Sequence, residues 1–155
     1  MTINMAIKYW LARILGSLEG INSPEKARET ILADVRRAKS ELNVVSCTAD
    51  LTYWNDEVIS EIESKLRRKP SVKIEFLIGP DMNNSRLEKL AREGKIKLIK
   101  LTYKPPCDCR IVDNRDTYLS NHGGDGRPRK YSWTFGNRPA LDDRIKYYNS
   151  LKRVA

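Results

Sequence analysis

The stretch PPCDCRIVDNRDTYLS, residues 105–120, decides how this chain is interpreted. Its centre, RIVD (110–113), is a short apolar run that ends on a carboxylate, and TYLS (117–120) is a second strand-like run. Asn114 and Arg115 between the two runs predict a hairpin. Because two cysteines that bracket an aspartate precede the hairpin, the stretch fits a catalytic strand, a metal site or a purely structural pair of strands.

The segments on both sides of this hairpin have the periodicities of an α/β domain. The expected helices cover residues 23–42, 56–69, 85–95 and 140–154, and the other expected strands cover residues 43–47, 71–79, 95–103 and 131–136. Helices alternate with strands before the hairpin, and a helix closes the chain. This order predicts an α/β sandwich with one mixed β-sheet flanked by helices.

Residues 1–22 are interpreted separately from a single domain at residues 23–155. Apolar residues recur there at helical spacing, among them Ile7, Trp10 and Ile14. We expect an amphipathic helix that packs on the domain or on a second copy of the chain in a homodimer. A helix lying on a membrane surface is the less favoured alternative, because its polar face carries few cations.

Composition narrows the possible partners. A net charge of +9, from 29 Lys and Arg against 20 Asp and Glu, favours an anionic partner such as nucleic acid, although a solvated basic surface has the same composition.

The chain has three cysteines, and this odd number argues against a secreted disulfide scaffold. No segment is apolar for long enough to span a membrane. Lys8 and Arg13 interrupt the first apolar run, so it is a poor secretory signal, and we expect a cytoplasmic protein.

The order of these segments resembles one half-domain of the phospholipase D-like superfamily. The resemblance begins at Ser23 and rests on a helix leading into NVVSC (43–47), on VKIEFLIGP (72–80), on GKIKLIKL (94–101) and on the hairpin. It implies a His-x-Lys pair followed, after four further residues, by Asp. In that family two such motifs meet across a pseudo-twofold or a dimer axis. One His attacks a phosphodiester, the other protonates the leaving group, and the lysines hold the phosphate.

Aligning that motif on Asp113 places Pro106 at the nucleophile position and Asp108 at the lysine position, so only Asp113 matches. Proline offers no nucleophile and no proton, and an aspartate repels a phosphate. We therefore expect Asp113 to be a remnant of a lost active site, with no catalytic residues and no cofactor. His122, the only histidine, is a secondary catalytic candidate, whereas an exposed loop histidine is the simpler interpretation.

Two other chemistries are weighed at the same stretch. A thiolate at Cys107 is disfavoured, because the carboxylate of the neighbouring Asp108 raises the pKa of a thiol. Zinc held by Cys107, Cys109 and His122 lacks the usual ligand spacing, so no metal site is expected and buried structural cysteines are favoured.

The segment after the hairpin combines cations with aromatic residues. Arg127, Arg129 and Lys130 attract phosphate, and Tyr131 and Trp133 offer rings for stacking on bases, although such rings also pack inside strands. These five residues are the predicted nucleic-acid site.

The sequence therefore predicts a non-catalytic domain that binds an anionic ligand, with DNA or RNA preferred, or that acts as a regulatory interaction module. The alternative is a phosphodiesterase or nuclease that works as a homodimer with an altered active site.

Overall fold

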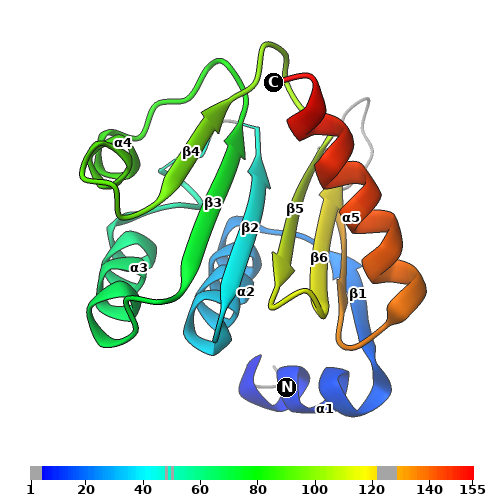
Figure 1. Ribbon diagram of the computed structural model, residues 1–155. Helices are drawn as coiled ribbons and strands as arrows, with labels where there is room; N and C mark the ends of the chain where they lie inside the picture. The colour runs from blue at the N-terminus through cyan, green and yellow to red at the C-terminus, as the bar shows by residue number, and fades with distance from the viewer. Residues whose placement is uncertain (1–4, 48, 50, 122–128) are drawn as a thin grey trace.

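The computed structural model describes residues 5–47, 49, 51–121 and 129–155 (Figure 1). Within these residues, seven strands form one mixed sheet in the order β1-β7-β6-β5-β2-β3-β4. β2, β3 and β4 are parallel to one another, whereas β5, β6, β7 and β1 join through antiparallel pairs. The strands are β1 (Ser17–Ile21), β2 (Glu41–Ser46), β3 (Lys73–Ile78), β4 (Lys97–Lys100), β5 (Cys107–Val112), β6 (Asp116–Asn121) and β7 (Lys130–Thr134).

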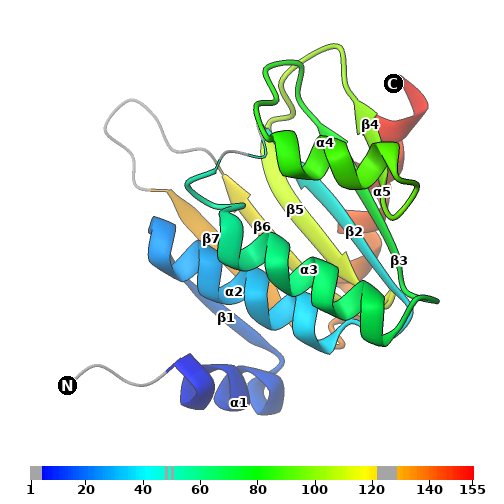
Figure 2. The same ribbon diagram turned by 90° about the vertical axis from the view of Figure 1, so that its left-hand side faces the viewer.

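Helices lie on both faces of the sheet. They are α1 (Met5–Leu15), α2 (Pro24–Arg37), α3 (Asp56–Arg68), α4 (Ser85–Arg92) and α5 (Arg138–Arg153). Figure 2 shows α2, α3 and α4 on one face, and Figure 1 shows α5 crossing the other. In each of the last four helices the N-cap side chain accepts a hydrogen bond from a backbone N–H of the first turn, as Ser23 does from Lys26. No helix in the described part of the chain is long and apolar enough to cross a membrane.

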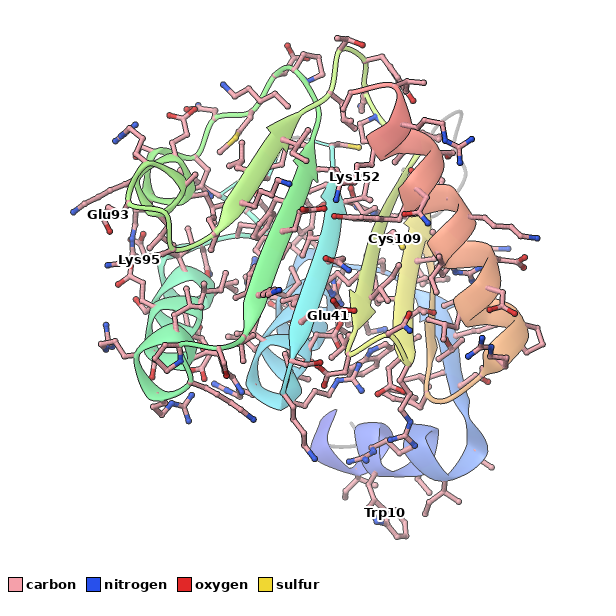
Figure 3. All side chains as sticks on the ribbon, in the orientation of Figure 1. Trp10, Glu41, Glu93, Lys95, Cys109 and Lys152 are labelled. Carbon is pink, nitrogen blue, oxygen red and sulfur yellow. The ribbon has the colours of Figure 1, made fainter. Side chains whose placement is uncertain are left out.

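Three apolar clusters hold these layers together. The first lies between the sheet and α2, α3 and α4, and includes the fully buried Val44 and Phe76. The second lies between the sheet and α5, where Cys109 packs with Leu141 and neighbouring residues (Figure 3). The third is an aromatic cluster formed by Tyr118, Tyr131, Trp133 and Phe135. Since strand side chains alternate between faces, the strands β2 and β3 contribute to both sides of the core, with Val44 and Phe76 in the first cluster and Val45 and Leu77 in the second.

The expected α/β sandwich with one mixed sheet is observed, but two expected boundaries are wrong. The first helix of the domain ends at Arg37 rather than at residue 42, and β2 already begins at Glu41. Residues 17–21, expected to be helical, form the edge strand β1, which pairs with β7. Gly16, with φ of +85°, ends α1 and turns the chain into this strand. The expected N-terminal segment, residues 1–22, therefore contains both α1 and the edge strand β1.

Several described apolar side chains of α1 are exposed. Trp10, Ile14 and Leu15 are 61%, 63% and 76% exposed, and Figure 3 shows Trp10 directed away from the body of the molecule. The packing of α1 on the domain or on a second copy of the chain stays a prediction.

Candidate functional site

The candidate site lies at the carboxyl ends of β2 and β3, where ligands bind in many open α/β sheets. β5 begins at this end and β6 finishes there, so that Asp108 on β5 lies opposite Ser120 on β6. Asp108 and Arg110 share the face of the sheet that α2 covers, because alternate residues of a strand share a face. The two positions that the family motif assigns to His and Lys, Pro106 and Asp108, are therefore at the same end of the sheet.

An ion pair between Asp108 and Arg129 occupies this site. The Nη2 of Arg129 donates to Asp108 Oδ2, its Nη1 donates to the hydroxyl of Tyr53 at 2.8 Å, and its Nε donates to Ser120 Oγ at 3.1 Å. The guanidinium also lies 4.9 Å from the centroid of the Tyr53 ring. The other carboxylate oxygen of Asp108 accepts the backbone N–H of Cys47 at 3.0 Å. Each charge is thus held by the other and by fixed neighbours.

The space beneath the ion pair is filled. Asn22 Nδ2 donates to the hydroxyl of Tyr118 at 2.8 Å and to Ser120 Oγ at 3.2 Å. The cavity lined by these residues and the ion pair has a volume of only about 20 Å³. A water molecule fits such a space, whereas a phosphodiester does not.

The cysteines near this site are protonated at neutral pH. Burial, followed by the nearby Asp108 carboxylate, raises the pKa of the Cys47 thiol to about 12. Burial likewise raises the pKa of Cys109 to about 12, and burial and Asp108 raise the pKa of Cys107. All three are free cysteines. Because the thiolate is the reactive form, none of these residues is an activated nucleophile.

The cysteines and acids of this site could also be expected to hold a metal ion. Among the described residues, no group of three or more His, Cys, Asp or Glu side chains is placed to hold a metal ion. His122, the third residue of the zinc alternative and the secondary catalytic candidate, lies outside the described residues.

Asp113 lies at the opposite end of β5 and has a structural role. Its carboxylate accepts the backbone N–H groups of Lys39, Ser40 and Glu41 at 2.8–3.1 Å, and the Ser40 hydroxyl at 3.0 Å. Burial acts to raise the pKa of Asp113, but these hydrogen bonds outweigh it and lower the pKa below the usual value. The residue fixes the turn between α2 and β2 against the β5–β6 turn.

The predicted nucleic-acid residues separate into three groups. Arg127 lies outside the described residues. Lys130 is exposed at the start of β7, and Arg129 just before it is engaged in the ion pair. Trp133 is fully buried and donates its Nε1 hydrogen to Asp34 at 3.2 Å, and Tyr131 is 8% exposed with its ring stacked on Tyr118.

The expectation that Tyr131 and Trp133 stack on bases is therefore wrong for this structure. The physical cause is the face of the sheet on which these rings lie. Alternate side chains of β7 point toward α2, where Asp34 accepts the Trp133 hydrogen and Ala33 packs against the aromatic cluster, together with Leu18 of the unpredicted strand β1.

Two residues of the site were missed from the sequence, Tyr53 and Asn22. Tyr53 follows the carboxyl end of β2, and an aromatic residue with a hydroxyl at such a position is a usable signal. No comparable signal marks Asn22, since its partners Tyr118 and Ser120 are 96 and 98 residues away in the sequence.

A wider groove lies on the face of the sheet beside α5. Its volume is about 710 Å³, and Glu75, Lys97, Tyr148 and Lys152 are among its lining residues. Glu75 accepts the Tyr148 hydroxyl and pairs with Lys152 at 2.9 Å and Lys97 at 3.6 Å. Since these polar groups satisfy one another, we assign no ligand to this groove.

Comparison with known proteins identifies the fold. No protein-family model matches the sequence, and the search of curated proteins finds no match. Among solved structures, the chain is similar to TrmBL2, an archaeal chromatin protein with a novel mode of DNA binding, at a TM-score of 0.69 and 13% identity. That match covers 96% of this chain and 60% of the other, so the chain spans less than two thirds of that protein.

Two further structures have nearly the same length as this chain. NucT from Helicobacter pylori matches at a TM-score of 0.66 and 11% identity, over 89% of this chain and 96% of that one. Nuc from Salmonella typhimurium, a phospholipase D family member, matches at 0.62 and 14% identity, over 89% and 94%. At these identities the likeness establishes the fold. The chain has the predicted phospholipase D-like fold.

Proposed function

We propose that this chain is a non-catalytic phospholipase D-like domain that binds an anionic ligand, and that the ligand is nucleic acid. The observation that carries the proposal is the Asp108–Arg129 ion pair, which fills the place where the resemblance puts phosphodiester chemistry. A carboxylate there repels a phosphate, and the arginine beside it is already neutralised.

The loss of catalysis is supported by the described side chains at this end of the sheet. The reaction needs a nucleophile with a base or a lowered pKa, and a cation for the developing charge. The thiol of Cys47 has a raised pKa, and the hydroxyls of Tyr53 and Ser120 are bonded to Arg129. Among the residues that the structure describes, neither hydroxyl contacts a base.

The choice of nucleic acid rests on charge and on fold. A net charge of +9 on 155 residues is a large excess for a domain of this size. The similar archaeal protein is a chromatin protein that binds DNA, and its match extends over 96% of this chain. Phosphate contacts by lysine and arginine supply affinity without sequence recognition.

Binding of fluorescently labelled DNA and RNA tests the ligand class. We expect binding at low ionic strength that weakens steeply as salt rises. Absence of binding to both probes at low salt would remove nucleic acid from the proposal.

A chromogenic phosphodiester, assayed without and then with divalent cations, tests the catalytic half of the proposal. We expect no turnover. Turnover that disappears in the His122→Ala variant would instead establish the alternative, a phosphodiesterase with an altered active site.

The exposed apolar side of α1 supports a second role, that of an interaction module or homodimer. Trp10, Ile14 and Leu15 present a continuous apolar surface that a partner would cover. Size-exclusion chromatography of the full chain and of a chain that begins at Gly16 tests this role. We expect the full chain to elute earlier than its added mass alone explains, and equal oligomeric states would remove the role.

A further inference from the structure

A second charged surface lies at the end of the sheet opposite the candidate site. In Figure 1 this is the lower end, where β2 and β3 begin, where β5 turns into β6, and beneath which α1 lies. The label of Glu41 marks the start of β2 in Figure 3. α2 and α3 also finish at this end, since each leads directly into the strand that follows it.

Cations are concentrated on the turns and helix ends of this surface. We call the following set the cationic edge: Arg13, Arg36, Arg37, Lys39, Arg67, Arg68, Lys69, Lys73 and Arg115. Lys39 lies in the α2–β2 turn, Lys69 and Lys73 flank the α3–β3 turn, and Arg115 lies in the β5–β6 turn. The side chains of Arg36, Arg68 and Arg115 are more than half exposed.

Hydrogen bonds place these turns side by side. The backbone N–H of Lys73 donates to the carbonyl of Ser40 at 2.9 Å, which joins the α3–β3 turn to the α2–β2 turn. The carboxylate of Asp113 bonds the backbone of the α2–β2 turn, which joins it to the β5–β6 turn. Neighbouring strands lie about 4.8 Å apart, so the turns present cations in a row at intervals of that order.

The acids of this region pair with arginines of the cationic edge and not with its lysines. Glu61 lies 3.6 Å from Arg36 and 3.4 Å from Arg68, and Asp116 lies 3.9 Å from Arg115. The carboxylate of Asp113 is occupied by backbone N–H groups, and that of Asp116 accepts Arg37 Nη1 at 2.6 Å and the backbone N–H of Gly136 at 2.8 Å. In the described part of the chain, Lys39, Lys69 and Lys73 are exposed and form no salt bridge within 4 Å.

A cleft of about 380 Å³ opens beside the row. Arg13 of α1, Arg37, Lys39, Asp113 and Arg115 are among the residues that line it. Four of the charged side chains that line it are cations, and the two acids, Asp113 and Asp116, already accept hydrogen bonds. The cleft is large enough to admit a phosphate group.

Lys65 holds the end of α2 at this surface. Its ammonium group is buried and donates to the carbonyls of Ala38, at 3.1 Å, and of Arg36, where it caps the end of α2. Burial lowers the pKa of Lys65, and the neighbouring Arg68 and Lys69 lower it further, while Glu61 and Asp113 act in the opposite direction.

We infer that the cationic edge binds the phosphate backbone of a nucleic-acid strand without sequence recognition, and that the Asp108–Arg129 end of the sheet does not. The inference rests on the proposed function, because it assigns the surface that performs it. Lys39, Lys69 and Lys73, which are exposed and form no ion pair among the described residues, lie in a row that matches a linear polyanion, whereas Arg129 at the other end is held by a carboxylate.

A membrane surface is the competing partner for a cationic patch. A flat layer of headgroups contacts protruding cations, but the exposed Lys39 lies beside a cleft of about 380 Å³, which a flat layer does not enter. A flexible strand can place single phosphates in such a cleft, which favours nucleic acid.

Two charge-matched variants test this assignment. The edge variant is Lys39→Gln/Lys69→Gln/Lys73→Gln, and the control variant is Lys104→Gln/Lys130→Gln/Lys146→Gln. All six lysines are exposed and, within the described residues, form no ion pair, so each variant lowers the net charge of +9 by three with the same side-chain chemistry. Thermal unfolding verifies that both variants fold.

The readout is fluorescence anisotropy of a labelled DNA strand and its duplex across a salt series from about 50 mM to about 200 mM. We expect the edge variant to bind on the order of tenfold more weakly at low salt, with a salt slope smaller by about 2–3. The control variant is expected to change affinity by less than about threefold, because it loses only distant, screened attraction.

The possible failures are distinguishable. If the wild-type chain binds no DNA, the proposed function fails together with the inference. If the wild type binds and the control variant loses as much affinity as the edge variant, only the inference is overturned. Binding to phosphatidylserine vesicles that depends on the edge lysines, without DNA binding, would assign the surface to membranes instead.

Discussion

The buried carboxylate of Asp34 allows a sharp test of how the fold is stabilised. It is fully buried on α2 and accepts four hydrogen bonds, from Arg37 Nε at 3.1 Å, Arg37 Nη2 at 2.6 Å, Arg110 Nε at 2.6 Å and Trp133 Nε1 at 3.2 Å. Arg110 is itself 4% exposed and lies on the central strand β5. The substitution Asp34→Asn keeps the size of the side chain and removes its charge.

The expected loss of stability follows from the contacts that Arg110 keeps in the variant. Its remaining partners are the hydroxyl of Thr30 at 2.8 Å and the ring of Tyr118, whose centroid lies 3.8 Å from the guanidinium carbon. Neither carries a negative charge, so the variant leaves a buried cation without its counter-ion. Breaking a buried ion pair in this way costs about 3–5 kcal/mol. Such a loss is a large part of the roughly 5–15 kcal/mol that stabilises a typical domain.

Urea unfolding, monitored by circular dichroism, measures this difference. The matched control is Asp142→Asn on α5, where the partner Arg138 is 77% exposed, and we expect it to cost about 0.5 kcal/mol or less. The double variant Asp34→Asn/Arg110→Met should be more stable than Asp34→Asn alone, because it removes the orphaned charge. A cost below about 1 kcal/mol for Asp34→Asn would refute the reasoning.

Three further predictions concern other parts of the molecule. The lowered pKa of Asp113 contributes stability that is complete above the unfolded-state pKa of about 3.9 and is lost as pH falls through the lower folded pKa. Asp113→Asn, which tolerates the observed φ of +53°, should therefore lose about 1–2 kcal/mol at pH 6 in urea unfolding and almost nothing near pH 2. The pKa values of the Cys47 and Cys109 thiols are raised to about 12, so little thiolate is present at pH 8. Both thiols should therefore react with Ellman's reagent at least about a hundredfold more slowly in the native protein than after unfolding. Rapid labelling of native Cys47 would contradict this. Deletion of residues 1–15 should leave the thermal transition of the protein in place. Deletion of residues 1–22 should lower the free energy of unfolding by on the order of 2 kcal/mol more, because it also removes β1. Equal stabilities of the two variants would show that the edge strand contributes nothing.

The elements that the sequence predicts correctly are those whose apolar residues repeat at a clear helical or strand spacing. The apolar side of α3, with Val58, Ile59 and Ile62 fully buried, repeats at helical spacing, and β3 alternates clearly. β1 has the sequence SLEGI and alternates between exposed and half-buried positions. A short edge strand that buries so little has no periodic signal, and its pairing with β7 depends on residues more than 100 positions away. The burial of Trp133 likewise depends on distant residues, since its hydrogen-bond partner Asp34 on α2 is 99 positions away.

In the candidate site, too, the sequence predicts what depends on neighbouring residues and misses what depends on distant ones. The sequence identifies Asp108 as the residue at the lysine position, which is a local fact. It does not show that Arg129, 21 residues later and just before β7, pairs with Asp108. Counting cations along the sequence therefore assigns Arg129 to ligand binding, although its charge is neutralised by Asp108. Because only an unneutralised cation attracts phosphate strongly, the lysines of the cationic edge are the stronger candidates, and no feature of their sequence separates them from other surface lysines.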